Sequence, residues 1–278
     1  MVRHRICFAV GLSFLATTTG LAEDAVAPPL LKPGGNRIVN GVPAKLEENL
    51  WQVALIVRWP NGASYLCGGS IVAEKWVLTA AHCFGDDPEH TYTVAVAGAL
   101  RYAPELAAGR GVAAEKVIFH EDYRPNEHGS DIALLRMRAR LSGNAIPMAS
   151  SARTLKVAQP LTVTGWGATS EGGDTSDKLL ITRVNYVDAD VCDAADSYDH
   201  TVRDDMICAG FPDGRTDACQ GDSGGPLVLR DLVNKSEGVL VGVVSYGKGC
   251  GRKLRYGIYT RVSSYSAWAW RTIRAYGQ

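Results

Sequence analysis

The sequence lacks an excess of charge of either sign. Its 29 Lys and Arg residues balance 29 Asp and Glu residues, so the formal net charge at pH 7 is +0. Proteins that hold nucleic acids or anionic membranes through a general electrostatic field carry a clear basic excess. We therefore expect no nucleic-acid partner and no membrane partner.

Long hydrophobic runs are missing as well. A membrane-spanning helix needs roughly 18 or more consecutive apolar residues, and the sequence contains no such run. With 46% hydrophobic and 21% charged residues, the composition is that of a globular protein rather than a disordered one.

Residues 1–22 have the pattern of a cleaved signal peptide. Arg3 and Arg5 precede an apolar stretch from Ile6 to Leu15, and small residues lead up to Ala22. A buried N-terminal helix is the alternative, but the order of charged, apolar and small residues favours the signal peptide. We expect a secreted protein, destined for the extracellular space or a periplasm.

The cysteine count fits export. Cys7 leaves with the signal peptide, and an even number remains, which in an exported chain indicates disulfides. Six cysteines allow 15 pairings, and the residues alone do not choose among them. Apart from the adjacent His82 and Cys83, no Cys/His cluster has zinc-binding spacing, so we predict no metal and no cofactor. The remaining cysteines are Cys67, Cys83, Cys192, Cys208, Cys219 and Cys250.

Residues 23–37 form a short segment without hydrophobic periodicity. Three prolines and two glycines among its 15 residues predict an exposed, flexible stretch. The segment ends at Arg37, and exposed flexible segments are preferred sites of proteolytic cleavage. A plain linker fits these features equally well, so the choice depends on the motifs further along.

The rest of the chain is rich in short strand patterns. They are dominated by β-branched and aromatic residues and separated by Gly, Pro, Asn and Asp, which favours an all-β sandwich or barrel. One helix is expected near the C-terminus, capped by Ser264 and running through Ile273. The predicted strands include 51–57, 70–72, 76–79, 92–96, 116–119, 132–135, 161–164, 226–229, 239–244 and 257–260.

Three motifs carry candidate chemistry: TAAHC around His82, SDIALL around Asp131, and GDSGGP around Ser223. Each has a structural alternative: a buried histidine, a turn-forming aspartate or an ordinary glycine loop. However, a carboxylate that opens an apolar strand is costly to bury without a partner, and His82 would supply one. Nucleophilic serine catalysis needs these three residue types together in space.

The motifs and their order resemble the chymotrypsin/trypsin family of serine proteases. The resemblance covers Ile38 to Gln278, 241 residues (278 minus 37). It implies an all-β fold of two packed six-stranded antiparallel β-barrels with a C-terminal helix, and an active site in the cleft between them. It also implies three parts: a signal peptide (1–22), an activation propeptide (23–37) and a protease domain (38–278).

The resemblance assigns catalytic roles. Ser223 would be the nucleophile, His82 the general base and acid, and Asp131 the residue that orients His82. The backbone N–H groups of Gly221 and Ser223 would form the oxyanion hole. Cleavage of the Arg37–Ile38 bond would free an α-ammonium group on Ile38 that pairs with Asp222. Activation would be autocatalytic if the enzyme accepts arginine.

The resemblance also implies the substrate. Asp217 would lie at the base of the pocket for the residue before the cleaved bond, selecting Arg or Lys, although a surface aspartate is the alternative. Gly247 and Gly257 would form the pocket walls. Ala218 stands where many trypsins carry serine, which favours Arg over Lys. The segment Ser245-Tyr246-Gly247 would pair with the substrate backbone.

By the same resemblance, the cysteines should pair as Cys67–Cys83, Cys192–Cys208 and Cys219–Cys250. Expected partners are proteins or peptides with Arg or Lys, and proteinaceous protease inhibitors; the chain is expected to be a monomer. Two other functions remain open: a catalytically inactive homologue acting as a binding module, and a serine esterase. The first would lack parts of the machinery, and the second would show a GxSxG motif and the order Ser, Asp, His.

Overall fold

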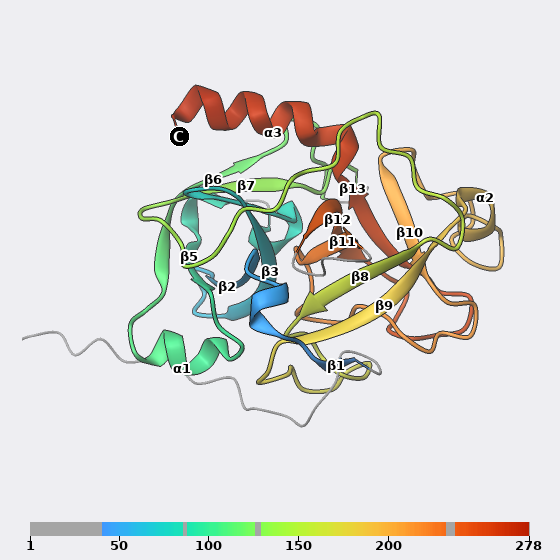
Figure 1. Ribbon diagram of the computed structural model, residues 1–278, viewed down its shortest axis with the longest axis horizontal. Coiled ribbons are helices and arrows are strands. Elements are labelled where there is room, and N and C mark those ends of the chain that lie inside the picture. The colour runs from blue at the N-terminus through green and yellow to red at the C-terminus, as the bar shows by residue number, and fades with distance from the viewer. Residues whose placement is uncertain (1–40, 86–87, 126–128, 232–236, 278) are drawn as a thin grey trace, which may run out of the picture. The chain divides into compact units, whose positions relative to one another are not determined.

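The structure is a computed structural model that describes residues 41–85, 88–125, 129–231 and 237–277 (Figure 1). The predicted signal peptide (1–22), the predicted propeptide (23–37) and the Arg37–Ile38 bond lie outside these ranges. Within them, no helix has both the length and the apolar character needed to cross a bilayer.

The first half of the described chain closes into a six-stranded antiparallel barrel. The strands are hydrogen-bonded in the order β2-β3-β4-β7-β6-β5, and pairing of β2 with β5 closes the ring. Strand β2 is buried on both faces, because Val53 and Leu55 face the barrel core while Ala54 and Ile56 pack in a second apolar cluster. The strands are β2 (Gln52–Arg58), β3 (Ser64–Ala73), β4 (Trp76–Thr79), β5 (Tyr92–Ala97), β6 (Val112–Phe119) and β7 (Ala133–Met137).

The second half closes into another six-stranded antiparallel barrel, in the order β8-β9-β10-β13-β12-β11. A two-residue strand, β1 (Val42–Pro43), adds to the outside of β9. The interior is apolar, with Val163, Leu227 and Tyr259 fully buried. The strands are β8 (Pro160–Gly165), β9 (Leu180–Val187), β10 (Met206–Gly210), β11 (Pro226–Arg230), β12 (Gly238–Tyr246) and β13 (Gly257–Arg261). The predicted two-barrel fold is therefore confirmed.

The C-terminal helix α3 (Val262–Tyr276) continues directly from β13 and packs against the first barrel (Figure 1). Its buried face includes Tyr265, Trp268 and Ile273. The prediction that Ser264 caps this helix is wrong: the helix begins two residues earlier, and Ser264 lies exposed in its first turn. Tertiary contacts set the start instead, since the guanidinium of Arg261 donates to the carbonyl oxygens of Asp204 and Met206.

The other helical segments are short. They are α1 (Tyr102–Ala107), α2 (Ala189–Cys192), η1 (Leu46–Glu48), η2 (Ala81–Phe84) and η3 (Pro88–His90). Helix α1 lies in the loop 98–111, whose one acidic residue, Glu105, is paired with Arg110.

Hydrogen bonds join the two barrels. The Thr164 hydroxyl of β8 donates to Oε1 of Gln52 in β2, and both side chains are buried. The N–H of Gly68 in β3 donates to the carbonyl oxygen of Ser223, at 2.7 Å. This second bond ties the loop that carries Ser223 to the first barrel.

The six described cysteines form three disulfides, Cys67–Cys83, Cys192–Cys208 and Cys219–Cys250, which is the pairing that the resemblance implies. Leu161 and Leu229 lie on the paired strands β8 and β11, in the second barrel's apolar cluster.

Candidate active site

His82 lies on η2, directly after β4, where the disulfide between Cys67 and Cys83 fixes the turn to β3. Its Nδ1 is 2.8 Å from Oδ2 of Asp131, and its backbone N–H donates to Oδ1 of the same carboxylate at 2.9 Å. The contact at Nδ1 fixes the orientation of the imidazole ring, and the N–H bond fixes the position of the His82 backbone. Because Nδ1 faces the carboxylate, Nε2 is the nitrogen left to exchange a proton.

Asp131 is 1% exposed and lies two residues before strand β7. Besides the two bonds from His82, its Oδ2 accepts a hydrogen bond from the hydroxyl of Ser245 in β12. Burial alone would raise the pKa of Asp131, but the His82 contacts and the Ser245 bond outweigh it and hold the pKa below its usual value. Burial acts to lower the pKa of His82, but the charge of Asp131 and its hydrogen bond to the ring together outweigh burial and raise that pKa above 6.5.

Ser223 lies on the glycine-rich turn that leads into β11. Its carbonyl oxygen is 3.8 Å from Sγ of Cys83, next to His82, so the turn lies against the histidine loop. Gly224 has φ +78°, and a Cβ there would lie 2.1 Å from Oγ1 of Thr79. Only glycine allows this close approach of the turn to the first barrel.

Only some of the backbone N–H groups of this turn donate hydrogen bonds to the described residues. The N–H groups of Asp222, Gly224 and Gly225 all donate to carbonyl oxygens. Among the described residues, the N–H groups of Gly221 and Ser223 donate to none. Gly221 has φ +93°, a conformation that side chains disfavour. Two free donors beside a serine hydroxyl are what an oxyanion hole requires.

A cavity of about 200 Å³ opens beside Ser223. Asp217 lies in its wall, 4% exposed, with Oδ2 accepting from the N–H of Gly251 at 3.0 Å and Oδ1 without a hydrogen-bond partner. Burial is the main reason that the pKa of Asp217 rises to about 7. The other residues that the sequence predicts to bind substrate, Ala218, Ser245, Tyr246, Gly247 and Gly257, all line this cavity.

Gly257 keeps the cavity open. A Cβ there would lie 3.0 Å from Oδ1 of Asp217 and 3.0 Å from the hydroxyl of Tyr259. A side chain at this position would therefore cover the free carboxylate oxygen. A larger cavity, of about 1000 Å³, lies around Trp51 and Arg230, and none of the predicted active-site residues lines it.

Asp222 is fully buried behind the serine turn. Its Oδ1 accepts from the N–H of Gly167 at 2.9 Å and its Oδ2 from the N–H of Cys219 at 3.0 Å. Within the described part of the chain it contacts no cation. Burial raises its pKa to about 6 in spite of the two bonds. The predicted partner, Ile38, lies outside the described residues.

The sequence did not reveal three supporting contacts. The Ser245 hydroxyl bonds to Asp131 in addition to lining the cavity, and the Thr260 hydroxyl donates to the carbonyl oxygen of Asp131 at 2.7 Å. The Gly251 N–H holds one oxygen of Asp217. Serines, threonines and glycines of this kind occur throughout the sequence, and only the folded register of β12 and β13 brings them to the site.

Two antiparallel six-stranded barrels, with the His82–Asp131 pair on the first and the Ser223 turn of the second hydrogen-bonded to it, match the chymotrypsin-like fold. The sequence profile of the family described as Trypsin matches residues 38–269. A mouse protein, transmembrane protease serine 11E (Mus musculus), is 36% identical over 236 residues. Those residues are 84% of this chain and 53% of that protein, so the chain spans about half of that relative's length. The chain belongs to the trypsin family of serine endopeptidases.

Proposed function

We propose that this chain is a secreted serine endopeptidase, made as a zymogen, that cuts peptide bonds after Arg in preference to Lys. The observation that carries the proposal is that Ser223 and Asp217 line one cavity of about 200 Å³. The carboxylate of Asp217 is buried there with one oxygen unpartnered, as a site for a cationic side chain requires.

In the proposed mechanism, the hydroxyl oxygen of Ser223 attacks the carbonyl carbon of the bond to be cleaved, and Nε2 of His82 takes the hydroxyl proton. The tetrahedral intermediate collapses as His82 returns this proton to the leaving amine, which leaves an acyl group on Ser223. Water then attacks the acyl group with His82 again as base, and Ser223 is regenerated. Asp131 stabilises the imidazolium that forms in both halves.

The negative charge on the intermediate needs donors that are already in place. The free N–H groups of Gly221 and Ser223 support an oxyanion hole at this position. One such donor contributes about 3–4 kcal/mol to the transition state. These donors belong to the same turn as the nucleophile. The positions of the donors and of the Ser223 hydroxyl therefore depend on the same backbone conformation.

Primary specificity follows from the cavity. A guanidinium can donate to Oδ1 of Asp217, which has no other partner, while Gly251 retains Oδ2. The planar fork of arginine reaches such a carboxylate directly. The side chain of lysine is shorter than that of arginine, and its ammonium group needs additional hydrogen-bond acceptors. The methyl side chain of Ala218, which lines the cavity, provides none. Arginine is therefore the preferred residue.

Activation is proposed to use the buried Asp222. A carboxylate with two N–H donors and no cation in the described structure is a poor arrangement for a charge in the protein interior. Cleavage of the Arg37–Ile38 bond would supply the α-ammonium of Ile38 as its partner. Since Arg37 fits the proposed specificity, activation is autocatalytic.

The proposed setting is extracellular or periplasmic, reached through the signal peptide of residues 1–22 and followed by loss of residues 23–37. The proposed partners are protein or peptide substrates with Arg or Lys and proteinaceous inhibitors, and the proposed state is a monomer. No cofactor or metal takes part in the mechanism.

The test is hydrolysis of matched arginyl and lysyl anilides by the full chain after cleavage before Ile38. We expect activity on both, higher kcat/KM for arginine, and complete loss in Ser223→Ala. A processed chain that folds but hydrolyses neither would instead be the binding module. Purified Ser223→Ala zymogen should remain uncut at Arg37, and processing without an added protease would disprove autocatalysis.

A further inference from the structure

The turn that delivers Asp131 to the site has an unusual backbone. Ser130 has φ +52°, in the left-handed region that residues other than glycine rarely adopt. The N–H of Ile132 donates to the carbonyl oxygen of Ser130 at 2.7 Å, which closes a three-residue turn centred on Asp131. The direction of the Asp131 side chain therefore depends directly on the conformation of Ser130.

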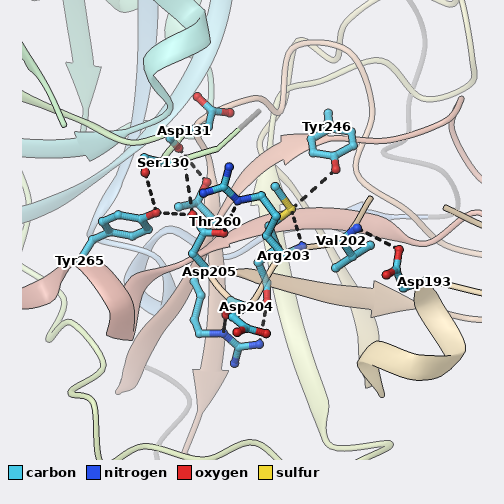
Figure 2. A network of polar contacts seen from close by, with 12 residues as sticks. Ser130, Asp131, Asp193, Val202, Arg203, Asp204, Asp205, Tyr246, Thr260 and Tyr265 are labelled. Atoms are coloured by element: carbon cyan, nitrogen blue, oxygen red, sulfur yellow. Dashed lines mark hydrogen bonds and ion pairs between the residues drawn. The ribbon is translucent and has the colours of Figure 1, made fainter. Parts of the chain in front are cut away.

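Asp205, which precedes β10, contacts this turn from the other barrel. Its Oδ2 accepts a hydrogen bond from the N–H of Ser130 at 3.2 Å. Figure 2 shows Ser130, Asp205 and Tyr265 next to one another, with the carboxylate between the turn and helix α3. The turn is thus held by a side chain 75 residues away in sequence.

Tyr265 of α3 closes the contact into a ring. Its hydroxyl is hydrogen-bonded to Oδ2 of Asp205 and lies 3.0 Å from Oγ of Ser130. A carboxylate can only accept, so the tyrosine proton goes to Asp205 and the serine hydroxyl donates to the tyrosine oxygen. Burial, and then the bond to Asp205, raise the pKa of Tyr265, so the hydroxyl keeps its proton at neutral pH.

Asp205 is itself fixed from two sides. Nε of Arg203 lies 3.3 Å from its Oδ1, and its carbonyl oxygen accepts from the N–H of Arg261 at the end of β13. The Arg203 guanidinium also lies against Gly129, where a Cβ would be 2.3 Å from Nη1. Asp205 is therefore held through its backbone and by an ion pair to its Oδ1, although that oxygen accepts no hydrogen bond.

We propose that Asp205 is a positioning residue, which holds Ser130 in its left-handed conformation and so aims the Asp131 carboxylate at Nδ1 of His82. This inference rests on the proposed catalytic role of Asp131. Asp205 touches neither the reacting atoms nor the substrate cavity. Its effect therefore falls on the rate of the chemical step and leaves substrate binding unchanged.

The test compares Asp205→Ala, Asp205→Asn and the matched control Asp204→Ala in the full chain processed before Ile38. Asp204 is exposed, and within the described part of the chain its side chain makes no hydrogen bond or ion pair. The readouts are kcat and KM on one arginyl anilide, and the far-downfield proton resonance of the His82 Nδ1–H bond to Asp131.

Asp205→Ala should lower kcat about 10- to 100-fold with KM nearly unchanged, because a small misplacement of an orienting group is costly in the transition state. It should also shift or broaden the His82 resonance. Asp205→Asn keeps an oxygen that can accept from Ser130, so it should restore most of kcat. Asp204→Ala should match the parent in every readout.

Parental kcat and resonance in Asp205→Ala would overturn the inference, even if that variant melts at a lower temperature. Should Asp205→Ala fail to fold, Tyr265→Phe decides, since it removes only the bridging hydroxyl; a several-fold loss of kcat supports the inference and parental kcat overturns it. An active parent with unresponsive Asp205 variants contradicts this inference alone. A parent without Ser223-dependent activity overturns the proposed function and this inference together.

Discussion

Asp131 holds His82 at two points, with Oδ2 2.8 Å from the ring Nδ1 and Oδ1 2.9 Å from the backbone nitrogen. The first contact sets the tautomer and supplies charge, and the second sets the position of the backbone. An amide at position 131 would preserve the shape of this arrangement but not its charge.

The Asp131→Asn variant separates charge from shape. We expect kcat to fall on the order of 10⁴-fold, because the amide favours the wrong tautomer of His82. Asp131 raises the pKa of His82, so the acidic limb of kcat/KM should move to lower pH in the variant. The measurement is a pH–rate profile on an arginyl anilide. Asp122→Asn, which alters an exposed carboxylate, is the control; a loss below 10-fold at position 131 would contradict the prediction.

Asp217→Asn should raise the free energy of unfolding and lower the activity on arginyl substrates. The pKa of Asp217 is about 7 in the folded chain against 3.8 for the free side chain. Ionising Asp217 therefore lowers the free energy of unfolding. This loss of stability is absent near pH 4 and complete above pH 7. The variant should gain up to about 4 kcal/mol at pH 8 and little at pH 4.

Urea unfolding at pH 4, 6 and 8 measures this gain, in a Ser223→Ala background that prevents self-digestion. Asp213→Asn, in the exposed part of the same stretch, should change stability little at every pH. In the active chain, Asp217→Asn should also lose most arginyl hydrolysis. A gain independent of pH would refute the assignment of a buried, ionisable Asp217.

Ala218→Ser places a hydroxyl in the cavity that Asp217 lines. A hydrogen bond to a charged group contributes about 1.5–3 kcal/mol, so kcat/KM for lysyl substrates should rise about 10-fold relative to arginyl ones. The arginyl rate in the same variant is the internal control. An unchanged ratio of the two rates would mean that position 218 does not contact the substrate ammonium.

Asp222→Asn should have opposite effects before and after cleavage at Arg37. In the uncleaved chain, the pKa of about 6 means that the charge costs stability at higher pH, so the variant should gain up to about 3 kcal/mol at pH 8. In the cleaved chain the ammonium of Ile38 would lose its partner, which costs about 3–5 kcal/mol and most of the activity.

Thermal unfolding of both forms, again with Ser223→Ala, measures this reversal. Asp174→Asn is the matched control because Asp174 is exposed and adjacent to Thr175, which lies against Gly221 of the serine turn. Destabilisation of the uncleaved form would show that Asp222 already has a cationic partner before cleavage, contrary to the proposed activation.

The all-β class was accessible from sequence because short runs of β-branched and aromatic residues, such as those of β2 and β5, are separated by turn residues. The two-barrel arrangement and the proposed roles of His82, Asp131 and Ser223 came from the resemblance that the three motifs carry. The start of α3 was not accessible: Ser264 is a good cap by residue type, but contacts of Arg261 with the chain before β10 determine where the helix begins.

The supporting contacts were inaccessible for a different reason. The bonds of Ser245, Thr260 and Asp205 span 114, 129 and 75 residues. The sequence pattern around a hydroxyl or carboxylate does not indicate a partner so distant. The role of each of these side chains depends on the pairing of β10, β12 and β13. The left-handed backbone of Ser130 could not be predicted from sequence either. Glycine is the residue expected in this conformation, and here a tertiary bond imposes it on serine.

His82 and Asp131 belong to the first barrel, whereas Ser223, Ser245 and Asp217 belong to the second. A chain that has folded only one of its halves therefore possesses a base without a nucleophile, or a nucleophile without a base. Under the proposed mechanism, such a partly folded molecule cannot hydrolyse peptide bonds, whether or not the propeptide is attached.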